Sequence, residues 1–350
     1  MEVANLNGIE IAGHYGDVQA EYRALWEAAG VLDLSFRGRL CLAGADRARF
    51  LHGQVTNDVK GLRVGEGCYA ALITAKGKMQ SDLNIYCLSD ELLLDFEPGL
   101  TTAVSQRLEK YVIADDVQII DVAANYGLLS VQGPKSDLVI RDSGIAHELP
   151  TKPFGFVRKD ETAFGEIHVF NHPRLGAAGF DVLAPTNGLE EIKKKLAAGA
   201  KSVGGCACGW DAFEIARIES GIPRFGADMD ETINPLEAGL EMRAISFNKG
   251  CYIGQEVISR IRTYSEVAKA LRGIRLADDL RSLPNKGDKL FHDGKEAGFI
   301  TSATKSPKLN ANIGLGYVRR EVNQPGAELV LRTKDGESSA RIVELPFVTR

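Results

Sequence analysis

The chain has 350 residues, of which 44% are hydrophobic and 25% are charged, and its formal net charge is −5. The composition excludes disordered and fibrous proteins, and the negative charge argues against nucleic acid or anionic membranes as partners. The length exceeds the roughly 250–300 residues that one hydrophobic core fills, so we expect two or three domains.

Targeting and redox signals favour a cytoplasmic protein. The N-terminus lacks the basic and apolar regions of a signal peptide, and no run approaches the roughly 18 apolar residues of a membrane span. Six cysteines in so long a chain do not make a disulfide framework, so reduced thiols are expected.

The first elements follow from local patterns. Residues 17–30 predict an amphipathic helix that begins after Asp17 and ends at Gly30. Residues 31–44 alternate like a pair of strands, and Asp46 then predicts the start of a short helix.

Residues 69–99 predict an antiparallel meander, because turn residues at positions 76–78 and 89–90 separate apolar strands. A helix over residues 100–111 and two strands over residues 116–134 follow. Strands, helix and strands in this order favour an α+β fold over a doubly wound parallel sheet.

The second half adds helices over residues 187–199 and 209–221, joined by a linker of small residues. After about residue 270, short strands separated by turns recur every 8–12 residues. This spacing predicts a separate small β-barrel or sandwich.

Several common sites are excluded by their spacing. The Gly-Lys pair at Gly77 lacks the other residues of a phosphate loop, and the glycines around Cys206 follow a polar segment instead of a strand. Cys206 and Cys208 stand too close for the usual zinc spacing, and the six histidines show no ligand pattern, so no metal site is predicted. The cysteines expected in the apolar core are Cys41, Cys68 and Cys87.

The segment NKGCYIGQE, residues 248–256, combines a thiol with a cation and two glycines. Lys249 would place positive charge beside Cys251, and the glycines would allow a ligand to approach closely. A buried cysteine in a turn is the equally weighted alternative.

Two acidic residues are further candidates. Glu219 ends a predicted helix, where the negative end of the dipole disfavours a carboxylate unless hydrogen-bond donors face it; on residue chemistry alone, a solvated surface position is favoured. Asp82 shares one side of a strand with Asn84 and Tyr86. That side is either a solvent face or the polar lining of a pocket.

The segment NKGCYIGQE resembles the K-G-C-Y-x-G-Q-E signature of the YgfZ-type folate-binding proteins, a branch of the glycine-cleavage T-protein (GcvT, aminomethyltransferase) superfamily. FLHGQVTNDVKGL, YAALITAKGKMQSDLNIY, LLSVQGP, ARIESGIPRFGADMDETINPLEAGL and SPKLNANIGLGYV match the superfamily in the same order. The resemblance implies an α+β fold, a three-domain ring of antiparallel sheets with helices plus a C-terminal β-barrel. It divides the chain into an aminomethyltransferase-like folate-binding region of two interleaved α+β subdomains, residues 1–268, and the barrel, residues 269–350.

The resemblance also implies tetrahydrofolate as the ligand. Glu219 matches the glutamate that binds the pterin, and one carboxylate can accept two parallel hydrogen bonds from an aminopyrimidine edge. Asp82 aligns with the catalytic aspartate of the T-proteins, although Ser81 replaces its acidic neighbour, and Cys251 stands where the T-protein pattern K-x-D-F-I-G has aspartate. The predicted catalytic residues are Cys251 and Asp82, the predicted folate-binding residues are Glu219, Asp82, Asn84, Tyr86 and Tyr69, and the motif residues are Lys249, Gly250, Cys251, Tyr252, Gly254, Gln255 and Glu256.

Two functions follow from the resemblance. The first is a tetrahydrofolate-binding accessory protein in iron-sulfur cluster assembly or repair, with assembly factors or client proteins as partners; since a cluster needs about four thiolates, a partner would supply most of its ligands. The alternative is an aminomethyltransferase that transfers a one-carbon unit to tetrahydrofolate, in which Asp82 orients or deprotonates the reacting amine. A folate-independent demethylase is disfavoured, because such chains usually carry an added dinucleotide-binding module.

The folate tail is a further open point. Five arginines offer cations for a polyglutamate tail, although surface solvation is their default role: Arg217, Arg224, Arg243, Arg260 and Arg262.

Overall fold

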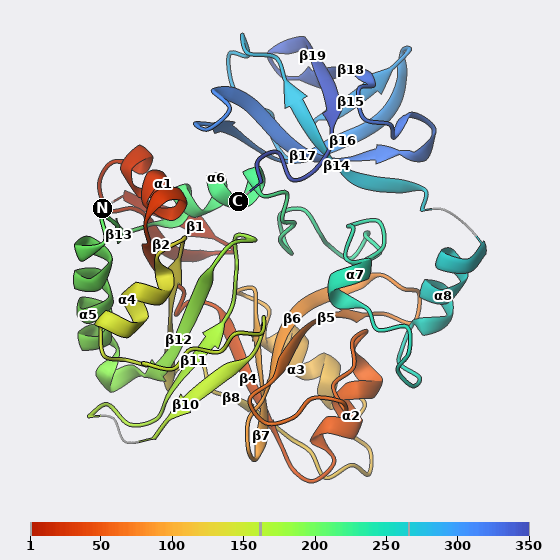
Figure 1. Ribbon diagram of the computed structural model, residues 1–350. Coiled ribbons are helices and arrows are strands. Elements are labelled where there is room, and N and C mark those ends of the chain that lie inside the picture. Colours follow the sequence, from red (N-terminus) through yellow and green to blue (C-terminus); the bar gives the residue numbers. More distant parts are fainter. Residues whose placement is uncertain (1, 161–162, 265–266, 350) are drawn as a thin grey trace. The chain divides into compact units, whose positions relative to one another are not determined.

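The computed structural model describes residues 2–160, 163–264 and 267–349, and Figure 1 shows its elements. The chain divides into two compact units, each built from three segments. Unit 1 comprises Met1–Ile73, Gln80–Phe213 and Arg243–Ile253, and unit 2 comprises Thr74–Met79, Glu214–Met242 and Gly254–Arg350. No helix in the described ranges combines the length and the apolar character needed to cross a membrane.

Unit 1 contains a five-stranded antiparallel sheet. Its strands are β4 (Gly38–Ala43), β5 (Gly67–Ile73), β6 (Met79–Cys87), β7 (Glu91–Phe96) and β8 (Gln118–Asp121), in the order β5-β6-β7-β4-β8. The predicted meander is confirmed as β5-β6-β7. Helices α2 (Arg47–Gln54) and α3 (Thr101–Glu109) add their apolar side chains to its core, around Leu72, Ile85 and Leu94, which are fully buried.

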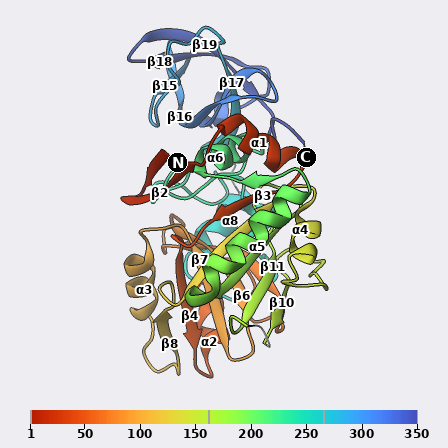
Figure 2. The same cartoon turned by 90° about the vertical axis from the view of Figure 1, so that its left-hand side faces the viewer.

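A second sheet in unit 1 has six strands. They are β3 (Gly30–Asp33), β9 (Tyr126–Gln132), β10 (Phe156–Lys159), β11 (Ile167–Asn171), β12 (Gly179–Pro185) and β13 (Cys206–Ala207), in the order β10-β11-β12-β9-β3-β13. Its helices are α1 (Val18–Glu27), α4 (Ser136–Asp142), the short 3-10 helix η1 (Thr186–Gly188) and α5 (Leu189–Ser202). Figure 2 shows α5 lying across this sheet with α4 beside it, and apolar side chains of both helices join the core of the sheet.

The N-terminal residues form a hairpin of β1 (Glu2–Leu6) and β2 (Ile9–His14). The predicted first helix is confirmed as α1, and the Asp17 side chain caps it by accepting a hydrogen bond from the Gln19 N–H.

Unit 2 contains a closed six-stranded barrel. Its strands are β14 (Lys269–Leu276), β15 (Lys289–His292), β16 (Lys295–Ser306), β17 (Ala311–Arg319), β18 (Glu328–Thr333) and β19 (Gly336–Val343), with the 3-10 helix η2 (Arg320–Val322) after β17. Along β18, buried Leu329 and Leu331 alternate with exposed residues, as a barrel wall requires. The remaining helices are α6 (Trp210–Glu219), α7 (Glu241–Ala244) and α8 (Gln255–Tyr264). The antiparallel sheets with helices and the barrel confirm the predicted α+β fold.

Two predictions from local pattern are wrong. β3 and β4 are both strands, but they do not pair: β3 pairs with β9 in one sheet and β4 pairs with β7 and β8 in the other. The connection between them is held by Arg39, whose guanidinium donates hydrogen bonds to the Ser35, Ala123 and Tyr126 carbonyls. The linker of small residues before α6 contains β13, which extends the six-stranded sheet as a parallel edge.

We predict that Gly44→Ala strongly destabilises unit 1. Gly44 has a φ of +104°, and an added Cβ would lie 2.1 Å from the Asp116 carbonyl oxygen. Strain and collision together should reduce the free energy of unfolding by roughly 2–4 kcal/mol, measured by chemical denaturation. Gly53→Ala is the matched control. Among the described residues, nothing beyond its own helix lies within 4 Å of the Cβ position, and inside α2 alanine should add about 0.5–1 kcal/mol. Equal stabilities of the two variants would contradict the described backbone.

Candidate functional site

Residues 249–253 of the cysteine motif lie along the C-terminal end of α2. The last carbonyls of a helix have no partner within the helix. Here the Ile253 N–H donates to the Gly53 carbonyl at 3.1 Å. The Lys249 Nζ donates to the carbonyls of His52 at 2.5 Å, Val55 at 2.7 Å and Asn57 at 2.8 Å.

This geometry gives Lys249 a structural role. A cation at the negative end of a helix is favourable, and three carbonyl acceptors fix its position. Burial lowers the pKa of Lys249 to about 8. The ammonium group of Lys249 is bound to the backbone that ends α2, and the expectation that it places positive charge beside the thiol stays a prediction.

The glycines of the motif differ in their roles. Gly254 has a φ of +85°, which L-residues rarely adopt, and it stands directly before α8. Gly250 has ordinary space around it, with the His52 Nε2 3.6 Å from the position of an added Cβ. Tyr252 is half-buried, its ring centroid 4.9 Å from the Lys249 Nζ, while Gln255 and Glu256 begin α8.

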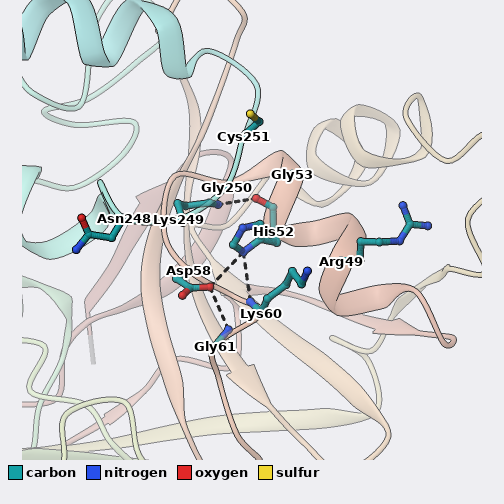
Figure 3. A pocket seen from close by; sticks show the side chains of 10 residues that line it. All are labelled: Arg49, His52, Gly53, Asp58, Lys60, Gly61, Asn248, Lys249, Gly250 and Cys251. Atoms are coloured by element: carbon teal, nitrogen blue, oxygen red, sulfur yellow. Dashed lines mark hydrogen bonds and ion pairs between the residues drawn. The ribbon is translucent and has the colours of Figure 1, made fainter.

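A cavity of about 520 Å³ lies between this motif and the end of α2. Figure 3 shows the side chains of its lining residues: Arg49, His52, Gly53, Asp58, Lys60, Gly61, Asn248, Lys249, Gly250 and Cys251. Cys251 is exposed and lies at the rim, apart from the group formed by His52, Asp58 and Lys60. The alternative of a buried cysteine in a turn is therefore excluded.

His52 is a cavity residue that the sequence did not reveal. Its Nδ1 lies 3.2 Å from the Asp58 Oδ1 and 3.3 Å from the Lys60 N–H nitrogen. Burial, and then the charge of Lys249, lower the pKa of His52. The described residues contain no group of three or more histidine, cysteine or acidic side chains that could hold a metal ion.

The other candidate group lies on β6. The Asp82 Oδ2 accepts a hydrogen bond from the Tyr69 hydroxyl at 2.9 Å, whereas its buried Oδ1 has no hydrogen-bond partner among the described residues. Burial, reinforced by the negative charge of Glu97, raises the pKa of Asp82 to about 6. Asp82 is thus a carboxyl group with one oxygen held by Tyr69, one oxygen without a hydrogen bond, and a pKa close to neutral pH.

Asn84 and Tyr86 share this side of β6, as alternation predicts, but both have partners inside the protein. Asn84 Nδ2 donates to the Asp95 Oδ2 at 2.8 Å, and the Tyr86 hydroxyl lies 2.9 Å from the His172 Nδ1. Their side chains are buried. A solvent-facing position is therefore excluded for Asn84 and Tyr86, and folate contact by these two residues stays a prediction.

Behind them lies a buried network of charges that joins the two sheets of unit 1. Arg37 Nε contacts the Asp95 Oδ1 at 2.8 Å, and Arg37 also donates to Glu97. Arg174 contacts Asp95 at 3.1 Å and Asp181 at 2.7 Å.

The proton affinities in this network follow from the pairing. Burial is the largest influence on the pKa of Asp95 and of Asp181, and it acts to raise both. The arginine charges nevertheless hold the pKa of Asp95 well below its usual range and lower the pKa of Asp181 to about 2. Sequence reasoning missed these residues, although charged residues such as Asp95 and Asp181 inside apolar strands were a usable signal.

Glu219, at the end of α6 in unit 2, is fully buried, so the surface alternative is wrong for it. Its carboxylate accepts a hydrogen bond from the Ser306 hydroxyl, and its backbone carbonyl accepts from Phe347 N at 2.9 Å and Val348 N at 3.3 Å. Glu219 belongs to unit 2, whereas Asp82, Tyr69 and Cys251 belong to unit 1.

Among the five arginines, Arg217 is also buried, and it contacts Glu214 at 2.8 Å and Asp228 at 2.6 Å. A solvated surface position is therefore wrong for Arg217, and its charge is used within unit 2. Arg243 and Arg260 are exposed.

Comparison with known proteins gives consistent similarities over the whole chain. Residues 2–249 match the GCVT N-terminal domain, and residues 269–349 match the glycine cleavage T-protein C-terminal barrel domain. The chain is 30% identical to an aminomethyltransferase of Geobacillus kaustophilus, with 98% of this chain and 93% of the relative covered. It is 32% identical to a putative chloroplastic transferase of Arabidopsis thaliana, with 91% and 71% covered. The crystal structure of the glycine cleavage system aminomethyltransferase T from Bartonella henselae has the same fold, with a TM-score of 0.88, 21% identity, and 99% and 94% coverage.

We predict that Lys249→Met destabilises the protein by roughly 2–4 kcal/mol, because three carbonyl groups at the end of α2 lose their charged donor. Urea denaturation measures this change. Lys60→Met, at an exposed lysine of the same cavity, is the matched control and should change the stability by less than about 0.5 kcal/mol. If both variants unfold at the wild-type midpoint, the capping role of Lys249 is refuted.

A second prediction concerns pH and Asp82→Asn. An acid with a raised pKa in the folded state binds its proton more tightly there than in the unfolded chain, so the wild type is penalised above about pH 6 and relieved as the pH falls toward 3.8. Asparagine keeps an acceptor for Tyr69 without the charge. The variant should therefore be more stable than wild type at pH 8, by on the order of 1–3 kcal/mol, and the difference should shrink below pH 6 in thermal melts.

Asp90→Asn, at an exposed position, is the control for that series and should show no such dependence on pH. A wild-type protein that is more stable than Asp82→Asn at pH 8 would show that the Asp82 carboxylate is well compensated, contrary to this description.

Proposed function

Because the chain belongs to the glycine cleavage T-protein family, we propose that it binds tetrahydrofolate and transfers a one-carbon unit to it, with Asp82 as the proton-transfer group. The relative from Geobacillus kaustophilus is named an aminomethyltransferase, and the one from Arabidopsis thaliana a putative transferase. These names favour a transferase over an accessory protein without a reaction of its own.

The observation that carries this proposal is the state of Asp82. One-carbon transfer from a carrier amine to a folate nitrogen requires that a proton leave the attacking nitrogen and that one reach the departing amine. A general acid–base group works best when its pKa lies near the operating pH. Asp82, with a pKa raised to about 6 and an unsatisfied Oδ1, meets that requirement, and the Tyr69 hydroxyl fixes its orientation.

The proposed pterin ligand is Glu219. An aminopyrimidine edge presents two parallel N–H donors, and one carboxylate can accept two parallel hydrogen bonds. The Glu219 carboxylate already accepts one from the Ser306 hydroxyl. The tetrahydrofolate would supply the nucleophilic nitrogen; the chain's own part is to hold the ring at Glu219 and the proton at Asp82.

Two measurements on the same variants test the proposal. Calorimetry with tetrahydrofolate should show binding to wild type, affinity loss of about 10–100-fold in Glu219→Gln from one to two lost charged hydrogen bonds, and near wild-type affinity in Asp82→Asn. A transfer assay with an aminomethylated carrier protein should show turnover that Asp82→Asn lowers by about 10²–10⁴-fold. Asp90→Asn serves as the matched carboxyl-to-amide control.

The absence of tetrahydrofolate binding by wild type would remove the proposal as a whole. Binding with full turnover in Asp82→Asn would retain the folate site but remove the assigned acid–base role.

Cys251 supports a second candidate, a folate-binding accessory role in iron-sulfur cluster assembly or repair. Cys251 is exposed at the rim of a cavity that Arg49 and Lys60 also line. Its thiol could supply one cluster ligand while a partner protein supplies the others. The discriminating variant is Cys251→Ser, with Cys87→Ser as the matched control. The accessory role is favoured if the wild-type protein restores a cluster in an apo client protein, Cys251→Ser does not, and neither shows transfer activity. The transferase is favoured if one-carbon transfer occurs and Cys251→Ser leaves its rate unchanged.

A further inference from the structure

Arg243 is held next to Tyr69 in unit 1, and the proposed function does not use its side chain. The residue that follows it is anchored to the five-stranded sheet. The Thr56 hydroxyl donates a hydrogen bond to the Ala244 carbonyl at 2.6 Å and accepts one from the Ala71 N–H at 2.9 Å. Tyr69 stands two residues before Ala71 on β5, so this link fixes the backbone of Arg243 beside the strand that carries Tyr69.

The Arg243 guanidinium has a charge without an ion pair. It lies over the Tyr69 ring, 5.6 Å from the ring centroid, and residues 2–160, 163–264 and 267–349 give it no ion pair or hydrogen bond. The residue is exposed. A cation over an aromatic face gains about 0.5–1 kcal/mol at an exposed site, and this contact leaves the N–H donors of the guanidinium for another partner.

Tyr69 connects this cation to the proposed proton-transfer group. Its hydroxyl donates to the Asp82 Oδ2 at 2.9 Å, so one tyrosine ring separates the guanidinium from this hydrogen bond. Both Tyr69 and Asp82 are only partly buried, which leaves the pair open to a ligand. The charge of Arg243 also reaches the hydroxyl. Burial, and then the charge of Asp82, raise the pKa of Tyr69 well above its usual range, and Arg243 acts to lower it.

A substrate with an anionic group needs a cation at this place. Asp82 and Glu97 both bring negative charge to the site. The cation that contacts Glu97 is Arg37, and it also contacts Asp95 in the buried network. A carboxylate that approaches Asp82 therefore meets like charge unless a cation outside the network binds it. Arg243 is outside the network, and its planar guanidinium can hold a carboxylate through two parallel hydrogen bonds.

We propose that Arg243 binds a carboxylate group of a substrate whose reacting nitrogen meets Asp82. This inference rests on the proposed function and deepens it. Two substrates can bring the carboxylate: tetrahydrofolate, through its glutamate part, and the one-carbon donor. In either case the substrate is bound at two points, by its nitrogen at Asp82 and by its anionic group at Arg243.

Calorimetry on the full-length chain tests tetrahydrofolate as the source of the carboxylate. Arg243→Met removes the charge and keeps a side chain of similar length. If the carboxylate is that of tetrahydrofolate, the variant should bind tetrahydrofolate about 10–100-fold more weakly than wild type, because one or two charged hydrogen bonds are lost. Its affinity for 6-methyltetrahydropterin, which has no carboxylate, should be unchanged. Arg260→Met, at an exposed arginine of α8, is the matched control and should bind both ligands like wild type.

A transfer assay at saturating tetrahydrofolate tests the donor as the source, with an aminomethylated carrier protein as the donor. If the carboxylate belongs to the donor, Arg243→Met should raise the KM for the carrier about 10–100-fold and leave the affinity for tetrahydrofolate unchanged. With either source, kcat should stay close to that of wild type, because Arg243 binds a group that does not react. Arg243→Lys should recover part of the loss, since it restores the charge without the paired donors.

The inference is overturned if wild type binds tetrahydrofolate and transfers the one-carbon unit, while Arg243→Met changes neither the Kd for tetrahydrofolate nor the KM for the carrier by more than about twofold. Equal weakening of tetrahydrofolate and 6-methyltetrahydropterin binding also overturns it, because Arg243 would then support the site without binding a carboxylate. A wild-type protein that shows neither binding nor transfer refutes the proposed function and this inference together, an outcome distinct from the first two.

Discussion

The uneven pairing of buried charges in unit 1 is the constraint on which the candidate chemistry depends. Arg37 and Arg174 contact Asp95, Glu97 and Asp181, and in the described part of the chain neither makes a hydrogen bond or ion pair with Asp82. A buried carboxylate without a cation keeps its proton to higher pH. The network therefore drives Asp95 and Asp181 toward full ionisation, whereas burial and the negative charge of Glu97 raise the pKa of Asp82 to about 6.

Several residues of the cysteine motif, residues 248–256, have structural roles. Lys249 and Ile253 satisfy carbonyls at the end of α2, and Gly254 supplies the left-handed turn before α8. These residues explain the motif as backbone architecture. Cys251 is the exception, because it is exposed at the rim of the cavity that this architecture creates. A functional role for the motif therefore rests on the thiol and not on the lysine.

The sequence predicted those elements that depend on interactions between neighbouring residues. The helix after Asp17, the β5-β6-β7 meander and the barrel strands all follow from caps, turns and alternation, and the structure has them. The separation of β3 and β4 into different sheets could not be read this way, because their partners are strands distant in the sequence. The burial of Glu219 depends likewise on Ser306 and on residues 347–348, far along the chain. The raised pKa of Asp82 was beyond sequence reasoning for the same reason, since it arises from burial and from the negative charge of Glu97, which the fold brings near it.

The most direct test of this account is a titration of the Asp82 side-chain carboxyl by carbon-detected NMR, assigned by comparison with Asp82→Asn. The account predicts an apparent pKa near 6 in wild type. It also predicts a further rise in Tyr69→Phe, because the hydroxyl that stabilises the ionised form is lost. A carboxyl that titrates near the ordinary value of 3.8 would contradict the account, since Asp82 would then carry no proton to transfer at neutral pH.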